Sequence, residues 1–159
     1  QLKAALITHT HPDHITGYED LLRLTGLPVA VHPADADRLP GKPAFHLEDR
    51  AELTVGQQRI RLLHTPGHTP GGICLLVDEC LVSGDTLFPG GPGMTRSAEA
   101  FKQLVESITK RLLTLPLGHG IYPGHGDDTS VAASKREYGR FNSKPRAADL
   151  FGTVRWDDP

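Results

Sequence analysis

One segment, Thr8–His14, restricts the possible folds and functions of this chain more than any other. Its sequence is Thr-His-Thr-His-Pro-Asp-His. Four side chains that can bind a metal ion lie within six positions of it: His9, His11, Asp13 and His14. Pro12 is incompatible with a regular helix through the middle, because proline lacks the amide hydrogen and its ring clashes with the preceding turn. The sequence therefore predicts a strand end followed by a tight loop.

The spacing divides these side chains into two pairs. Residues two apart in an extended chain point to the same side, so His9 and His11 form one pair. Asp13 and His14 lie together on the turn that follows and form the other. Each pair can bind one metal ion, and imidazole and carboxylate without thiolate suit zinc, iron or manganese. The simpler interpretation is a solvated polar loop, but four such residues this close together favour a metal site.

Three more ligand-type residues share one setting, a glycine-rich turn after a strand-like run. They are His68 within Thr65–Gly72, Asp85 within Ser83–Thr86 and His125 within Pro123–Gly126. Glycine lets the backbone approach an ion closely, and ligands at strand ends converge along one edge of a sheet. The chain has nine histidines but only 6% aromatic residues. Five of these histidines and two aspartates suffice for two metals, with positions left open for water or substrate.

The composition is typical of a single soluble domain. The 159 residues, 38% hydrophobic and 23% charged, are predicted to form a single domain, 1–159. A formal net charge of −2 provides no general attraction to nucleic acid or to an anionic membrane. No apolar run approaches the roughly 18 residues of a membrane-spanning helix, and the first residues do not form a signal peptide. We expect a cytoplasmic protein that acts on a small molecule.

The apolar pattern predicts alternating strands and helices, a mixed α and β class. Strands are expected over 3–8, 28–32, 59–64, 73–77, 80–83, 120–123 and 152–156. Helices are expected over 17–24, between the N-cap Ser97 and Pro116, and over 130–141, with a helical turn at 33–39 and loops at 40–50 and 87–96. In the hairpin 72–84, Val77 faces Cys80, so Cys74 and Cys80 are not opposed. Both are expected to be reduced, packed thiols.

The pattern His-x-His-x-Asp-His, completed by the three later ligands, resembles the metallo-β-lactamase superfamily. Thr65–Gly72 and Ser83–Phe88 resemble its glyoxalase-II-like hydrolase branch, and the resemblance runs from Lys3 to about Asp128. It implies an α+β fold, the αββα sandwich. It also implies that one metal is held by His9, His11 and His68, that the other is held by Asp13, His14 and His125, and that Asp85 bridges the two.

Three features depart from that family pattern. True β-lactamases of the superfamily commonly have cysteine at the bridging position, so Asp85 argues against antibiotic hydrolysis. Leu87–Thr95 stands in the place of the glutathione-binding motif of glyoxalase II. Its glycine-rich part, Pro89–Thr95, is expected either to form one wall of the pocket or to be a plain connector. Only residues 1–7 precede the first histidine motif, so roughly the first quarter to third of the sandwich is expected to be missing. We therefore expect either additional residues before Gln1 or a second copy of the chain filling the open sheet, a homo-oligomer.

The resemblance implies a hydrolase with two divalent metal ions, of which zinc is favoured and iron or manganese is an alternative. Asp13 and Asp85 are expected to hold a hydroxide that attacks an ester, thioester or lactone. An alternative is a mononuclear iron enzyme of the persulfide-dioxygenase type, with His9, His68 and Asp85 as ligands. A third is an inactive, truncated domain. The remaining histidines are expected outside the site: His32, His46, His64 and His119.

Overall fold

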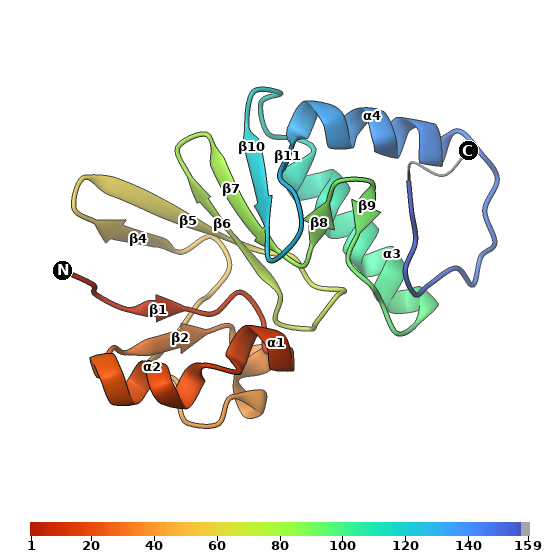
Figure 1. Ribbon diagram of the computed structural model, residues 1–159. Coiled ribbons are helices and arrows are strands. Elements are labelled where there is room, and N and C mark those ends of the chain that lie inside the picture. Colours follow the sequence, from red (N-terminus) through yellow and green to blue (C-terminus); the bar gives the residue numbers. More distant parts are fainter. Residues whose placement is uncertain (157–159) are drawn as a thin grey trace.

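The chain folds into two facing β-sheets with helices on their outer sides (Figure 1). A computed structural model describes residues 1–156, so the last three residues of the predicted domain lie outside the described part. The order of layers is helix, sheet, sheet, helix, which confirms the predicted αββα architecture. None of the helices within residues 1–156 is long and apolar enough to cross a membrane.

The smaller sheet has three short parallel strands, β1 (Ala5–Leu6), β2 (Val29–Val31) and β3 (Phe45–His46). The helix α2 (Tyr18–Thr25) and the 3-10 helix η1 (Pro33–Arg38) cover its outer face. Both helices contribute apolar side chains to a cluster that includes Tyr18, Val29 and Val31. The helix α2 ends where predicted, because Gly26 adopts a left-handed conformation with φ of 61°.

The larger sheet has six strands, in the order β11-β10-β7-β6-β5-β4. Their bounds are β4 (Glu52–Val55), β5 (Gln58–His64), β6 (Ile73–Val77), β7 (Cys80–Gly84), β10 (Gly120–Pro123) and β11 (Thr129–Ser130). Strands β5 and β7 are each antiparallel to β6, and β10 is parallel to β7. The carboxyl ends of β5, β7 and β10 therefore lie at the same edge of the sheet.

Helices α3 (Ala98–Ser107) and α4 (Val131–Asn142) cover the outer face of the larger sheet (Figure 1). Ser97 caps α3 as predicted, since its hydroxyl accepts a hydrogen bond from the amide of Ala100 at 3.1 Å. The last part of the predicted helix is not α-helical. It is the π-helical turn η2 (Ile108–Leu112), in which the amide of Leu113 donates to the carbonyl of Ile108. Another apolar cluster, which includes Ala30, Leu47, Leu62 and Ile73, lies between the two sheets.

Several local predictions need correction. Pro12 opens a one-turn helix, α1 (Pro12–Ile15), because proline is compatible with the first helical position. Strand β4 has no counterpart in the prediction, and β3 lies within the loop expected over 40–50. The 87–96 loop contains a small hairpin of β8 (Leu87–Phe88) and β9 (Gly91–Pro92). The predicted strand at 152–156 is reduced to a single bridge between Thr95 and Gly152.

The two cysteines have different surroundings. The predicted pairing of Val77 with Cys80 is confirmed, and both thiols are free. Cys74 is buried, but Cys80 is exposed, so the expectation of two packed thiols is wrong for Cys80. Cys80 is the first residue of β7, directly after the hairpin turn, where no layer covers its side chain. Burial raises the pKa of the Cys74 thiol to about 11.

A thiol reagent is therefore expected to modify one cysteine per folded chain. Cys80 should react fast, while Cys74 should react only after unfolding, because it is both inaccessible and protonated at neutral pH. Absorbance-monitored labelling with and without denaturant measures this difference. The Cys80→Ser variant should give almost no labelling of the folded chain, and fast reaction of both thiols in the folded wild type would contradict this.

Candidate metal centre

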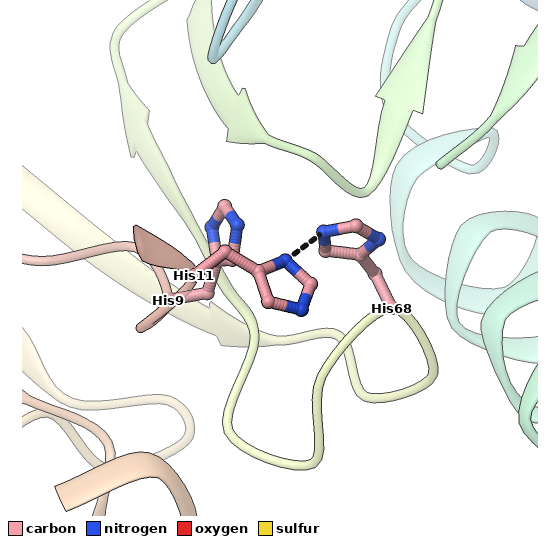
Figure 2. A group of neighbouring side chains, drawn as sticks. All are labelled: His9, His11 and His68. Carbon is pink, nitrogen blue, oxygen red and sulfur yellow. Dashed lines mark hydrogen bonds between the residues drawn. The ribbon is translucent and has the colours of Figure 1, made fainter. Parts of the chain in front are cut away.

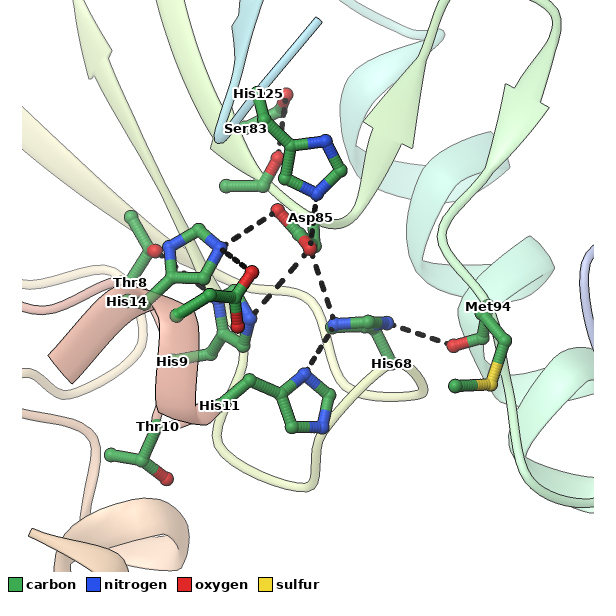
Figure 3. A network of polar contacts seen from close by, with 12 residues as sticks. Thr8, His9, Thr10, His11, His14, His68, Ser83, Asp85, Met94 and His125 are labelled. Atoms are coloured by element: carbon green, nitrogen blue, oxygen red, sulfur yellow. Dashed lines mark hydrogen bonds and ion pairs between the residues drawn. The ribbon is translucent and has the colours of Figure 1, made fainter. Parts of the chain in front are cut away.

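All seven ligand-type residues predicted from the sequence converge at one edge of the sandwich. His9 and His11 follow β1, and Asp85 follows β7 (Figure 3). His68 lies between β5 and β6, and His125 follows β10. They meet because the carboxyl ends of these strands lie together, the edge at which α/β sheets commonly place their ligands.

The first group contains three histidines, His9, His11 and His68 (Figure 2). One ring nitrogen from each lies within 4.8 Å of the others. The His11 Nδ1 and His68 Nε2 atoms are only 2.8 Å apart. The His9 side chain is 2% exposed, and its Nε2 atom has no hydrogen-bond partner among the described residues.

The second group contains Asp13, His14, Asp85 and His125, again with ligand atoms within 4.8 Å of one another. His125 Nε2 lies 3.1 Å from Asp85 Oδ2, and His14 Nε2 lies 3.3 Å from Asp85 Oδ1. His14 Nε2 also lies 3.6 Å from Asp13 Oδ2. The Asp13 side chain is 65% exposed, whereas Asp85 is buried at 7%.

Asp85 connects the two groups. Its Oδ2 atom lies 3.5 Å from His68 Nε2 and 3.9 Å from His9 Nε2, in addition to its contacts with the second group. Gly124 makes room for this carboxylate, since a Cβ atom there would overlap Asp85 Oδ1 and lie 2.5 Å from His14 Cε1. A carboxylate whose Oδ2 atom faces histidines of both groups, and whose Oδ1 atom faces His14, has the arrangement of a bridging ligand.

Hydrogen bonds outside the cluster orient two of the rings. His68 Nδ1 lies 2.8 Å from the carbonyl oxygen of Met94, which can only accept, so Nδ1 carries the hydrogen and Nε2 keeps its lone pair (Figure 3). His9 Nδ1 contacts the Thr8 hydroxyl at 3.3 Å, which leaves its Nε2 directed into the cluster. The sequence contained no sign of the Met94 carbonyl contact, because any residue can supply it.

Two histidines of the first group, His9 and His11, are held in the neutral form. Burial, reinforced by neighbouring imidazoles, lowers the pKa of His9 to about 2. Burial and the adjacent His68 also lower the pKa of His11 below its ordinary value. Neutral imidazole is the form that binds metals, so this environment favours ligation at neutral pH.

Acidification is expected to destabilise the metal-free protein. His9 stays neutral in the fold but takes up a proton below its ordinary pKa of 6.5 when the chain unfolds. Stability is therefore complete above that pH and is lost as the pH falls, by about 2 kcal/mol from His9 alone on reaching about pH 5. Urea unfolding of chelator-treated protein, measured above pH 6.5 and again at about pH 5, gives this loss of stability. The His9→Gln variant should lose less stability over the same change of pH. An equal loss in that variant would contradict the assignment to His9.

A cleft of about 600 Å³ opens beside the cluster. His68, Asp85 and His125 line it, and so does the whole loop from Phe88 to Met94. The expectation that this glycine-rich loop forms a pocket wall is therefore confirmed. The segment containing Thr153 and Arg155 lines the cleft as well, which brings the end of the chain next to the site.

The other histidines lie outside the cluster, as expected. His32 and His64 stack on each other with ring centroids 3.9 Å apart. His32 also caps η1 by accepting the amide hydrogen of Ala34, and His64 Nε2 contacts the carbonyl of Pro70 at 2.9 Å. His46 and His119 belong to neither ligand group.

The residues present fit a divalent metal ion. Two buried atoms at the centre, His9 Nε2 and Asp85 Oδ1, have no hydrogen-bond partner among the described residues. Leaving such atoms without a partner is costly, and a bound cation would satisfy both. Imidazole and carboxylate donors without thiolate suit zinc, iron or manganese.

Comparison with known proteins agrees with this geometry. The model of the metallo-beta-lactamase superfamily matches residues 1–142. The "Probable metallo-hydrolase YqgX" of Bacillus subtilis is 36% identical over 148 residues, covering 80% of this chain and 70% of that protein. A hydroxyacylglutathione hydrolase of Anaeromyxobacter dehalogenans is 38% identical over 120 residues, covering 76% of this chain and 46% of the relative.

Solved structures show the same fold. ETHE1 from Myxococcus xanthus superposes with a TM-score of 0.77 at 33% identity, covering 91% of this chain and 65% of that one. The di-iron-bound form of TTHA1623 superposes with a TM-score of 0.72 at 31% identity, covering 84% and 74%. The chain spans from about half to about seven tenths of the length of these four proteins. On the family match, the identities and the shared fold, this chain belongs to the metallo-beta-lactamase superfamily.

Proposed function

We propose that this chain is a hydrolase with two divalent metal ions that acts on an ester, thioester or lactone of a small molecule. The observation that carries the proposal is the position of Asp85 between the two ligand groups, 3.1 to 3.9 Å from one nitrogen of four histidines. The relatives named as a metallo-hydrolase and a hydroxyacylglutathione hydrolase support this class of reaction.

The proposed ligands follow the two groups. His9, His11 and His68 would hold one ion, and Asp13, His14 and His125 the other, with Asp85 shared. Zinc is our first choice for this donor set. When bound, two such ions lower the pKa of a shared water toward about 7 and polarise the carbonyl of the substrate.

The two aspartates would share the work of proton handling. Buried Asp85 is placed to accept a hydrogen bond from the water and orient it, because the surrounding histidines hold its carboxylate in position. Asp13 is at the solvent-facing side, where its carboxylate can take the proton and return it to the leaving group. Water adds to the acyl carbon, the bond to oxygen or sulfur breaks, and the alcohol or thiol leaves with a proton.

The cleft supports a small-molecule substrate. Its volume of about 600 Å³ lies within the range usual for small-ligand sites, and its lining includes His68, Asp85 and His125 of the metal centre. Its walls are mostly apolar, with Phe88 and Met94 on one side and Arg155 from the end of the chain on another. An acyl group would therefore meet apolar surface directly beside the proposed metals.

The decisive experiment is elemental analysis together with paired activity measurements. We expect about two metal ions per chain, and hydrolysis of thioester or lactone probes that is faster than that of a phosphodiester or a β-lactam probe. Chelation should abolish the activity and zinc should restore it. Absence of bound metal, or hydrolysis unaffected by chelation, would refute the proposal.

A mononuclear iron oxygenase is the second candidate. His9 Nε2 and His68 Nε2 both face Asp85 Oδ2, at 3.9 and 3.5 Å, and two histidines with one carboxylate form the ligand set of such enzymes. One iron per chain, no zinc and oxygen consumption with a persulfide would favour this candidate over the hydrolase.

A further inference from the structure

Asp35 is a fully buried carboxylate outside the ligand groups. It lies in η1, with 0% of the residue exposed. Its Oδ1 atom accepts the amide hydrogen of Gly71 at 2.7 Å, and its Oδ2 atom accepts that of Thr10 at 3.2 Å. The Thr10 hydroxyl donates to the backbone oxygen of Asp35 at 3.3 Å. Both carboxylate oxygens are therefore used, and both by backbone amides.

These two amides belong to the two loops that carry the three-histidine group. Thr10 lies between His9 and His11, and Gly71 lies three residues after His68. A single carboxylate thus joins the loops from which the three imidazoles arise. The only other backbone link of this kind between described residues of these loops runs from the Ile73 amide to the Thr8 carbonyl, at 3.0 Å.

We propose that Asp35 is a positioning residue that sets the separation of His9 and His11 from His68 and so determines the metal affinity of that group. The inference rests on the metal centre proposed above. A carboxylate is required because it accepts from two amides at once. Asparagine offers one acceptor oxygen and turns an NH₂ group toward the other amide, and alanine leaves both buried amides without a partner.

The connection between Asp35 and the loop after His68 also depends on Gly71. A Cβ atom at this position would lie 2.7 Å from the Cβ, Cγ and N atoms of Asp35. Only glycine allows the loop to approach the carboxylate this closely, so a methyl group must push the loop and Asp35 apart. Gly71→Ala therefore disturbs the same connection while the carboxylate remains.

The neighbouring contacts hold Asp35 in place from behind. His32 caps the helix that carries Asp35 and stacks on His64 at an interplanar angle of 11°. His64 in turn contacts the carbonyl of Pro70, next to Gly71. The helix η1 and the loop after His68 are therefore connected by two independent routes, which restricts the position of the carboxylate.

The test measures binding of metal alone. Zinc affinity is measured by competition with a chromophoric chelator, and cobalt binding by the visible absorption of the ion. We expect Asp35→Asn and Gly71→Ala to weaken zinc binding at the three-histidine group by about 10- to 100-fold, the usual effect of removing a group that orients metal ligands. The cobalt spectrum should change in both variants, because the ligand geometry changes.

Two controls separate positioning from general destabilisation. Asp37→Asn changes an exposed carboxylate two residues along the same helix and should leave affinity within about twofold of wild type. Leu39→Ala removes buried packing of the same layer without touching either loop amide, so it should lower the melting temperature but keep the cobalt spectrum. If Asp35→Asn does not fold, Gly71→Ala and Leu39→Ala alone decide the outcome.

Each result has a definite meaning. Unchanged metal affinity in Asp35→Asn, or in Gly71→Ala when the former is unfolded, overturns the inference. An equal loss of affinity in Leu39→Ala also overturns it, because stability alone would then explain the effect. Failure of the wild type to bind zinc or cobalt would instead refute the proposed metal centre, and the inference with it.

Discussion

Replacement of Asp85 by alanine is expected to lower kcat/KM for the best ester or thioester probe by about 10²- to 10³-fold, the loss typical of removing one preorganised polar group from an active site. The reason is that the Asp85 carboxylate lies within 3.9 Å of histidine nitrogens from both ligand groups. The variant should also bind less metal, because neither group keeps its shared carboxylate. Steady-state kinetics and elemental analysis of the same preparation measure the two losses together.

Two matched substitutions serve as controls for this prediction. Asp37→Ala removes an exposed carboxylate, and His46→Ala removes an exposed imidazole on β3. Both should retain activity within about twofold of wild type, since surface changes of this kind rarely alter stability or function. If either control lost as much activity as Asp85→Ala, the active site would have to lie elsewhere in the chain.

Replacement of Trp156 by alanine is expected to lower the free energy of unfolding by about 3–5 kcal/mol, the usual cost of deleting a large buried ring. Trp156 is fully buried and packs against Tyr138 and Phe141 of α4, with ring centroids 5.0 and 5.8 Å apart. Its backbone amide donates to the carbonyl of Gly90 at 2.7 Å. The side chain therefore anchors the end of the chain beside the wall of the cleft.

Urea unfolding monitored by circular dichroism measures the effect. Trp156→Phe should cost much less, because it keeps an aromatic ring and removes the indole Nε1, which has no hydrogen-bond partner among the described residues. Phe151→Ala is a suitable control, since Phe151 lies nearby in sequence and is 53% exposed. A loss below about 1 kcal/mol in Trp156→Ala would mean that this segment does not support the fold.

The seven clustered ligand-type side chains and the mixed α and β class could be predicted from local sequence alone. Closely spaced histidines and aspartates leave few alternatives to a metal site, and the glycines around His68, Asp85 and His125 marked them as strand-end turns. The helix beginning after Ser97 and ending before Pro116 was likewise encoded by its cap and its apolar period. Such patterns involve residues close together in the sequence, so they can be recognised without knowledge of the neighbouring layers.

Other features depend on contacts between distant segments. In the sequence, Asp35 resembles any polar residue in a helical turn. It becomes a buried hydrogen-bond acceptor because η1 packs against the loops of Thr10 and Gly71, which are 25 and 36 positions away in the sequence. The exposure of Cys80 depends on which layer covers the start of β7. The sharing of Asp85 between two histidine groups likewise arises from strand order, because parallel β7 and β10 bring their carboxyl ends together. Local sequence determines which atoms can bind an ion, whereas the sandwich determines which of them meet.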